Sequence, residues 1–248
     1  MTETAIIIPS RLSAKRLPNK PLKTINNKEM VLHVHDIAIK ANIGEVFVAS
    51  PDEEIIKVVR GYGGKAVITK KEHETGTDRI FEVFEKELEK KPKYIINLQG
   101  DMPNLNFSAI RELSNHMKKN SCDIGTLASN LGNEKELRDI NVVKVIVQND
   151  IKKKEFSRAL DFFRVSKQEN NNLTYHHIGI YGFTNEALIR YVNLKRSKLE
   201  IERKLEQLRA LNNKMKIEVG YVQQCPLSVD TEEDFKEIKK LMETNDKN

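Results

Sequence analysis

The chain of 248 residues has no tryptophan, only two cysteines and few aromatic residues, which make up 6% of it. Cys122 and Cys225 lie far apart and outside any C-x-x-C pattern, so the sequence predicts neither a disulfide framework nor a cysteine metal site. It also has no run of 18 apolar residues, and the apolar residues 6–8 are followed at once by charge. Neither a membrane span nor a signal peptide is indicated, and we expect a cytoplasmic protein.

The net charge of +6 raises the question of nucleic-acid binding. The lysines are spread along the chain, however, and no helix-turn-helix, zinc-finger or RNP pattern is present. The sequence therefore does not predict a nucleic-acid partner. A net positive charge is equally compatible with a small and highly anionic substrate.

Apolar and amphipathic segments alternate along the chain, which is typical of an α/β fold. Six segments are predicted strands: residues 5–8, 45–49, 65–68, 94–98, 124–128 and 142–147. Six are predicted helices: residues 30–42, 52–62, 77–90, 107–119, 199–213 and 232–243. We expect right-handed βαβ units that build a mainly parallel sheet with helices on both faces. The polar residues 167–172 are interpreted as a loop or lid.

Common nucleotide-binding signatures are missing. No G-x-x-x-x-G-K-[ST] loop occurs, which argues against a P-loop NTPase. Gly61, Gly63 and Ala66 match the letters G-x-G-x-x-A, but they leave a predicted helix and enter a strand, the reverse of a dinucleotide fingerprint. His33 and His35 cannot face one ligand from a helix, since positions two apart point in different directions.

A basic loop follows the first predicted strand. Arg11, Lys15, Arg16 and Lys20 lie in it, and Pro18 and Pro21 limit its freedom. The strand brings this loop to the carboxyl edge of the sheet, where ligand sites of α/β proteins lie, so the cations could surround a polyphosphate. A solvated basic loop is the alternative, because charged runs usually lie at the surface.

Two aspartates complete a possible magnesium site. Asp101 follows Gly100 at the end of a predicted strand, and Asp230 precedes a capping box formed by Thr231 and Asp234. Mg²⁺ is held by one or two carboxylates together with phosphate oxygens. For Asp101 alone, a plain strand-to-helix turn would be the simpler interpretation.

With these clusters in place, the chain resembles the 3-deoxy-manno-octulosonate (Kdo) cytidylyltransferases over nearly its whole length. Matching segments occur in the order of that family: Ile8-Pro9 to Leu22, Thr75-Gly76-Thr77-Asp78-Arg79, Gln99-Gly100-Asp101, Phe156-Ser157-Arg158, His177-Ile178-Gly179-Ile180-Tyr181-Gly182, Leu205-Glu206-Gln207-Leu208-Arg209 and Val229-Asp230-Thr231. The first of these is shared by many sugar nucleotidyltransferases. The segments around Arg158, His177 and Glu206 are more specific.

The chain departs from the family pattern at several points. Met102 replaces the glutamate that commonly follows Gln-Gly-Asp, and Ala14-Lys15 replaces a serine-containing pair. Residues 159–163 of this chain, Ala-Leu-Asp-Phe-Phe, stand where the family has a proline-bearing segment, and Pro226-Leu227-Ser228 stands where it has Pro-Gly. None of these changes removes a residue that the resemblance assigns to the site.

The resemblance implies a Rossmann-like nucleotide-diphospho-sugar transferase fold, with residues 1–248 as one domain and residues 151–215 as a smaller sugar-binding and dimerisation lobe. It implies transfer of CMP from CTP to Kdo for lipopolysaccharide biosynthesis, with Mg²⁺ as cofactor and a homodimer as the assembly. Catalysis would fall to Arg11, Lys20 and Asp101, and the metal to Asp101 and Asp230. The nucleotide would be bound by Arg11, Arg16, Lys20, Thr75, Gly76, Arg79 and Gln99.

Kdo is an acidic sugar, and its pocket should combine a cation with polar groups. The resemblance assigns Arg158, His177, Tyr181, Glu206 and Gln207 to it. His177 could instead be a structural histidine, and Tyr181 a core residue. Apolar residues at helical spacing from Ile201 to Met215 predict a core or dimer stripe that leaves Glu206 and Gln207 off it. The alternatives are a cytidylyltransferase for another sugar acid, such as acylneuraminate or 8-amino-Kdo, and a catalytically silent nucleotide binder.

Overall fold

The computed structural model describes residues 3–14, 16–153, 156–165 and 172–245. The chain divides into two compact units, one of residues 1–111 with 226–248 and one of residues 112–225. The predicted lobe at residues 151–215 falls within the second unit, whereas Lys15 and most of the predicted loop at 167–172 lie outside the described residues. None of the described helices has the length and apolar character needed to cross a bilayer.

The first unit contains four parallel strands, all close to their predicted positions. They are β1 (Thr4–Pro9), β4 (Glu45–Ser50), β5 (Lys65–Ile68) and β6 (Tyr94–Leu98), in the order β5-β4-β1-β6. The side chains of Ile6, Ile7 and Ile8 are fully buried. A strand buried on both faces needs such a continuous apolar run, which is why these segments were recognisable in the sequence.

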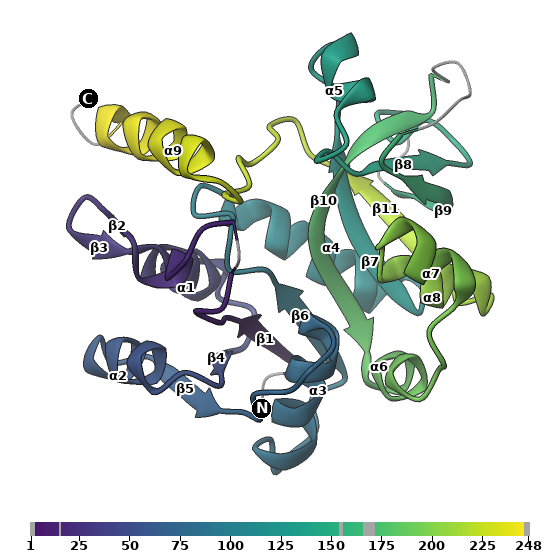
Figure 1. Cartoon of the computed structure of the whole chain (residues 1–248). Coiled ribbons are helices and arrows are strands. Elements are labelled where there is room, and N and C mark those ends of the chain that lie inside the picture. The colour runs from purple at the N-terminus through teal and green to yellow at the C-terminus, as the bar shows by residue number, and fades with distance from the viewer. Residues whose placement is uncertain (1–2, 15, 154–155, 166–171, 246–248) are drawn as a thin grey trace. The chain divides into compact units, whose positions relative to one another are not determined.

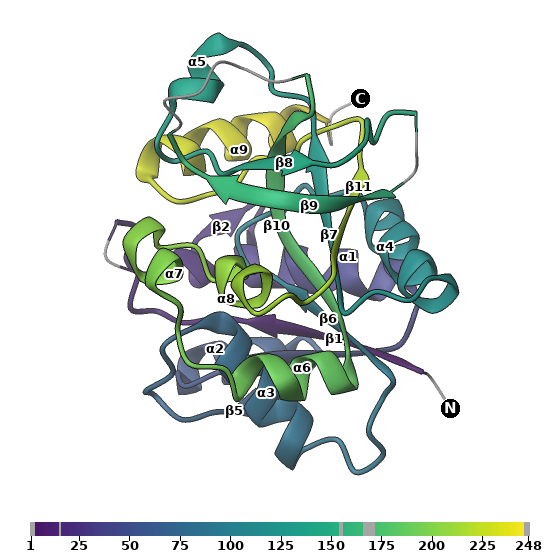
Figure 2. The ribbon, with the colours of Figure 1, turned by 90° about the vertical axis from the view of Figure 1, so that its right-hand side faces the viewer.

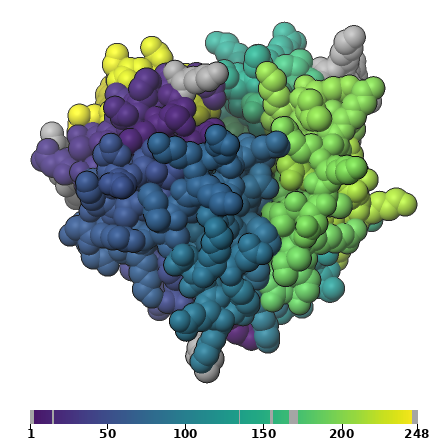
Figure 3. All heavy atoms as spheres, turned by 60° about the horizontal axis from the view of Figure 1, so that its bottom comes forward, coloured from purple at the N-terminus to yellow at the C-terminus, as the bar shows by residue number. Residues whose placement is uncertain are grey.

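Helices α1 (Met30–Ala41), α2 (Glu53–Gly61) and α3 (Gly76–Lys86) connect these strands in the predicted βαβ pattern (Figure 1). In Figure 3, α2, β5 and α3 form the blue surface of this unit. The segment after α2 is a helix end and turn as predicted: Gly61 closes α2 and Gly63 has a φ of 88°. Helix α3 ends before the predicted residue 90, at the cap Glu87.

In this unit, residues from the N-terminal part of the chain pack against residues from its C-terminal part in a small apolar cluster. A 3₁₀ turn η1 (Lys20–Leu22) and a hairpin of β2 (Thr24–Ile25) and β3 (Lys28–Glu29) follow the basic loop, and α9 (Glu232–Asn245) closes the chain. The members of the cluster are Leu17, Ile25, Met30, Val229, Phe235 and Ile238. Because Leu17 of the basic loop and Val229 beside Asp230 both belong to this cluster, their packing holds the two segments next to each other.

The second unit is not mainly parallel, and the prediction is wrong for it. Its strands are β7 (Ile124–Ser129), β8 (Lys144–Val147), β9 (Phe156–Phe163), β10 (Thr174–Thr184) and β11 (Ile217–Tyr221), in the order β10-β7-β11-β9-β8. Among the described strands of this unit only β7 and β11 pair in parallel. Strand β10 also pairs with β8, so the five strands close on themselves (Figure 2). Antiparallel closure depends on long-range pairing, which local periodicity does not encode.

Helix α4 (Phe107–Lys119) has its predicted bounds, and the division between the units falls within it. The second unit also contains α5 (Glu134–Arg138), α6 (Asn185–Val192), α7 (Lys198–Arg203) and α8 (Gln207–Asn212). The single predicted helix at residues 199–213 is wrong, since Lys204 adopts a left-handed conformation, φ 54°, and ends α7. Helices α6 to α8 appear in green at the surface in Figure 3, and Ile201 of the predicted stripe is 56% exposed.

Candidate active site

The basic loop starts where β1 ends and is held by three contacts. Asp52 accepts a hydrogen bond from the Leu12 backbone nitrogen at 2.7 Å, and Leu17 is buried in the apolar cluster. Asn19 then turns the chain in a left-handed conformation, φ 57°, into η1. As a result Arg11 and Arg16 remain exposed, whereas the Lys20 side chain is only 16% exposed. Asp52 had been interpreted only as the start of a helix, so its support of this loop was missed.

Lys20 lies between the two predicted metal ligands. Its Nζ is 3.4 Å from Asp101 Oδ2 and 3.4 Å from Asp230 Oδ1, and it donates a 2.7 Å hydrogen bond to the Val229 carbonyl. Arg16 adds a 2.9 Å ion pair to the other oxygen of Asp230. The fold therefore brings together residues that are more than 200 positions apart in the sequence.

Backbone contacts fix the position of both carboxylates. The Val229 nitrogen donates to the Asp101 carbonyl at 2.9 Å, which links the two segments directly. The carboxylate of Asp234 accepts from the nitrogens of Asp230 and Thr231, at 2.9 and 2.8 Å. The predicted capping box at the start of α9 is thus confirmed, and it also holds Asp230 in place.

The electrostatics of this cluster suit a divalent cation. Burial raises the pKa of the Asp101 carboxyl, Lys20 opposes the rise, and the neighbouring Asp230 carboxylate adds to it. Two carboxylates that converge on one ammonium form a site in which more positive charge would be favourable. Asp101 and Asp230 therefore fit the hard oxygen donors that Mg²⁺ takes.

The segment from Thr75 to Arg79 packs on the end of β1 and against Gln99. A Cβ on Gly76 would lie 3.4 Å from both Gln99 Nε2 and the Pro9 side chain, which shows how closely these segments pack. Gln99 Nε2 donates to Asn97 Oδ1 at 2.8 Å, which orients the amide and leaves its oxygen as an acceptor. Gly76 and Gln99 are thus close neighbours, which is compatible with the prediction that both bind the nucleotide.

Thr75 and Arg79 have structural contacts that the sequence analysis did not foresee. Thr75 forms a capping box with Asp78 at the start of α3. The Arg79 guanidinium is buried and donates to the Thr69 hydroxyl and, at 2.9 Å, to the Lys70 carbonyl. Burial and the nearby Arg11 lower the pKa of Arg79. These contacts shape the wall beside Arg11, and a direct role in nucleotide binding stays a prediction.

In the second unit, His177 and Tyr181 flank a bulge in β10. The register of β10 on β7 shifts between Ile178 and Tyr181. Within this bulge the Ile180 carbonyl accepts a hydrogen bond from the Thr126 hydroxyl at 2.7 Å. A bulge re-aims the side chains beside it. Here it sets the rings of His177 and Tyr181 5.5 Å apart, centroid to centroid.

His177 is buried and neutral. Burial, with a smaller effect of His176, lowers its pKa to about 3. Because the Thr126 hydroxyl gives its proton to Ile180, its oxygen accepts from His177 Nε2 at 2.9 Å. The other ring nitrogen is then an acceptor, suited to a hydroxyl but unable to neutralise a carboxylate. Arg158, the one cation among the predicted sugar ligands, is exposed on β9, and its pairing with a carboxylate stays a prediction.

Glu206 and Gln207 stand at the start of α8 and rest on a buried support. Glu206 precedes the helix, and its carbonyl accepts from the Tyr191 hydroxyl at 3.1 Å. Burial and then Glu206 raise the pKa of Tyr181, so that carboxylate lies near the Tyr181 hydroxyl. Gln207 is buried instead of facing outward, which the predicted apolar stripe did not indicate because it assumed one continuous helix.

Arg209 and Glu200 form a buried ion pair beneath Tyr191, the residue whose hydroxyl binds the Glu206 carbonyl. Two hydrogen bonds of 2.7 and 3.0 Å join them, and their side chains are only 4% and 1% exposed. The Arg209 guanidinium also lies 4.7 Å from the centre of the Tyr191 ring. Neither Glu200 nor Tyr191 was singled out in the sequence, since each looks like an ordinary helix residue there.

Comparison with known proteins identifies the family of this chain. A family model described as cytidylyltransferase matches residues 5–217. Curated relatives named 3-deoxy-manno-octulosonate cytidylyltransferase include proteins of Bartonella tribocorum, 40% identical over 97% of this chain and 98% of the relative, and Brucella ovis, 41% identical over 94% and 93%.

Solved structures give the same result. A CMP:2-keto-3-deoxy-manno-octonic acid synthetase complexed with CTP is 33% identical, covers 98% of this chain and 99% of its own, and has a TM-score of 0.87. A 4-diphosphocytidyl-2C-methyl-D-erythritol synthase of Anaerococcus prevotii, 14% identical over 97% and 98% with a TM-score of 0.64, shares the fold alone. The family resemblance in the sequence is confirmed: this chain belongs to the cytidylyltransferase family, among the 3-deoxy-manno-octulosonate cytidylyltransferases.

Proposed function

We propose that this chain transfers CMP from CTP to Kdo and releases diphosphate, a step of lipopolysaccharide biosynthesis. The observation that carries the proposal is similarity of about 40% over nearly the full length to relatives named for this activity. The cluster of Asp101, Lys20 and Asp230 supports it independently, because it provides the charges that phosphoryl chemistry needs.

In this reaction a sugar hydroxyl attacks the α-phosphorus of CTP in line, the bond to the β-phosphate oxygen breaks, and diphosphate leaves. Negative charge grows on the phosphorus oxygens and on the leaving group. Arg11 and Arg16 are exposed on the basic loop, where they are available to the triphosphate, and Lys20 is anchored beneath them. Fixed cations of this kind stabilise the transition state more than the ground state.

Asp101 and Asp230 would hold Mg²⁺. When bound, Mg²⁺ neutralises phosphate charge and lowers the pKa of a coordinated hydroxyl, so a strong side-chain base is not required. Lys20 holds its ammonium between the two carboxylates and on the Val229 carbonyl, where it would place a fixed positive charge beside the metal and the phosphates.

Gln99 is proposed to read the base. Its amide oxygen can accept from the exocyclic amine of cytosine, while its nitrogen stays on Asn97. Thr75, Gly76 and Arg79 form the adjacent wall. For the sugar, Arg158 would pair with the carboxylate, and His177, Tyr181, Glu206 and Gln207 would bind hydroxyl groups.

The direct test is diphosphate release by the purified protein with CTP and Kdo, with and without Mg²⁺. We expect turnover only with both substrates and the metal, and slower turnover with UTP. Activity with acylneuraminate or 8-amino-Kdo exceeding that with Kdo would favour another sugar-acid cytidylyltransferase. CTP binding without any turnover would identify a silent nucleotide binder.

Arg158→Ala and Lys20→Ala should have opposite effects on the two substrates. Loss of a charge-assisted bond costs roughly 1.5–3 kcal/mol, so Arg158→Ala should raise the KM for Kdo about 10- to 100-fold and change that for CTP little. Lys20→Ala should weaken CTP first. Steady-state kinetics with each substrate varied will show the bias. A CTP defect with normal sugar affinity in Arg158→Ala would refute the assignment of Arg158.

A cytoplasmic homodimer is proposed, as symmetric dimers are the commonest state of such enzymes. The second unit exposes the large apolar side chains of Leu160, Val165 and Ile201, each more than half accessible. Such residues are candidates for an interface. Sedimentation velocity at micromolar protein should give twice the chain mass of 28.6 kDa, and a monomer would contradict the proposal.

A further inference from the structure

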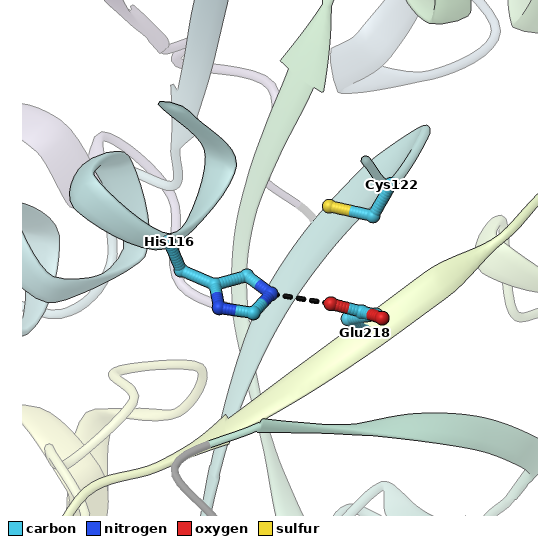
Figure 4. A group of neighbouring side chains, drawn as sticks. All are labelled: His116, Cys122 and Glu218. Atoms are coloured by element: carbon cyan, nitrogen blue, oxygen red, sulfur yellow. Dashed lines mark hydrogen bonds and ion pairs between the residues drawn. The ribbon is translucent and has the colours of Figure 1, made fainter. Parts of the chain in front are cut away.

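A cluster of three metal-binding residue types lies in the second unit, and none of its members is assigned to the proposed reaction, although Glu218 lies opposite Arg158 on the neighbouring strand. His116 comes from α4, Cys122 from the segment before β7, and Glu218 from β11 (Figure 4). Their ligand atoms lie within 4.8 Å of one another. No sequence pattern predicts this cluster, since 102 positions separate His116 from Glu218 and Cys122 belongs to no cysteine motif.

We propose that His116, Cys122 and Glu218 form a Zn²⁺-binding site. An imidazole nitrogen, a thiolate and a carboxylate are the three donor types that zinc takes in proteins, and a tetrahedral ion bound by them keeps one position for water. With bonds of about 2.0–2.3 Å the donors would lie about 3.3–3.8 Å apart. The ligand atoms lie within 4.8 Å of one another, and His116 Nε2 and Glu218 Oε2 are in hydrogen-bond contact, so metal binding would separate that pair while the Cys122 sulfur moves inward. The inference does not depend on the proposed reaction.

The surroundings hold the ligands in the orientation that a metal requires. The His116 ring stacks on Phe156, 3.5 Å between centroids, and Phe156 lies flat because Gly220 has no side chain: a Cβ there would come within 2.6 Å of the ring. Lys216 Nζ binds Glu218 Oε1 at 2.8 Å and leaves Oε2 directed at His116 Nε2. Such contacts behind the ligands are usual at metal sites.

The other ring nitrogen of His116 also has a neighbour. The Asn120 side-chain nitrogen lies 3.0 Å from Nδ1 and donates at 3.2 Å to the His116 carbonyl. A histidine that binds metal through Nε2 commonly donates from Nδ1. Metal binding would therefore require the Asn120 amide to turn its oxygen toward Nδ1 and to give up its bond to the carbonyl.

Without metal, each of the three side chains contacts another group of the protein. Glu218 accepts from both His116 and Lys216, and the Cys122 thiol contacts Met117 Sδ at 3.3 Å. Burial and then Glu218 raise the pKa of Cys122 to about 12, and Lys216 opposes this. Cys122 is therefore an unreactive thiol, and zinc binding would release its proton to the solvent. The ion would tie α4, β7 and β11 together.

The test uses metal-free full-length protein titrated with Zn²⁺, and with Co²⁺ as a spectroscopic probe. We expect one equivalent to bind, a thiolate-to-cobalt charge-transfer band, and a Tm increase of about 5–10 °C with zinc at a hundredfold excess over Kd. Excess Mg²⁺, a hard cation, should not displace it.

Cys122→Ser should abolish the cobalt band and lower zinc affinity more than about 100-fold, and His116→Gln should weaken binding while keeping the band reduced in intensity. Cys225→Ser is the matched control and should bind like the wild type. Circular dichroism of the metal-free variants separates lost binding from lost folding. The proposal is overturned if Cys122→Ser binds zinc normally, if Cys225→Ser loses the band, or if the wild type binds no stoichiometric zinc.

Discussion

Asp101→Asn and Asp230→Asn are each expected to reduce kcat about 10²- to 10³-fold while the fold is retained. Asparagine keeps the size of the side chain but loses the charge that would hold Mg²⁺, and the missing stabilisation corresponds to about 2.7–4 kcal/mol. Turnover at saturating CTP and Kdo, measured over a range of Mg²⁺ concentrations, gives the effect.

Stability should change little in these variants. The pKa of Asp101 is raised by burial, so its ionised form is not favoured by the fold, and asparagine removes a charge that is costly there. Glu232→Gln is the matched control: its carboxylate lies two positions from Asp230 and pairs with Lys23 at 2.9 Å at the surface. Nearly normal Mg-dependent turnover in either aspartate variant would remove that residue from the metal site.

Arg209→Met is expected to lower the free energy of unfolding by about 3–5 kcal/mol, because it leaves the almost fully buried carboxylate of Glu200 without its main partner. Urea unfolding at neutral pH measures this. Arg203→Met is the control, since Arg203 binds Asp161 in an ion pair whose side chains are 36% and 37% exposed. An accessible pair of this kind contributes about 1 kcal/mol or less.

The same pair predicts a pH dependence. Burial acts to raise the pKa of Glu200, but the hydrogen bonds and the charge of Arg209, together with hydrogen bonds from Ser197 and Arg196, outweigh it and the pKa is lowered from 4.5. The stabilisation is therefore present above pH 4.5 and is lost as the pH falls below it through the lowered value. Arg209→Met should flatten this acid loss. An unchanged unfolding free energy, or an unchanged acid profile, would show that the pair does not hold α7 and α8 together.

Arg209→Met should also affect the sugar. Arg209 packs on Tyr191, whose hydroxyl binds the Glu206 carbonyl. Loss of this support would displace Glu206 and Gln207 and raise the KM for Kdo more than that for CTP. Together with the stability result, this would distinguish a supporting residue from a ligand.

Strands and helices of the first unit were determined by the sequence, because their signals are local. Residues 6–8 form one continuous apolar run, and a buried parallel strand has no other pattern. The basic loop, Asp101 and Asp230 could be identified in the same way, since each directly follows a strand or precedes a capping box. The family resemblance rested on such segments and was confirmed by the comparisons.

Only the tertiary structure decided the strand order of the second unit. It also decided which residues hold the predicted nucleotide-binding and sugar-binding residues in place. The closed strand order of β10, β7, β11, β9 and β8 arises from long-range pairing. The helix break at Lys204 has a left-handed backbone, and the Leu205 and Leu208 side chains that follow it are buried. Lys20 meets Asp230, and His116 meets Glu218, across 210 and 102 positions. Sequence periodicity reports which face of an element is buried, but the partners that meet there are set by how the elements pack.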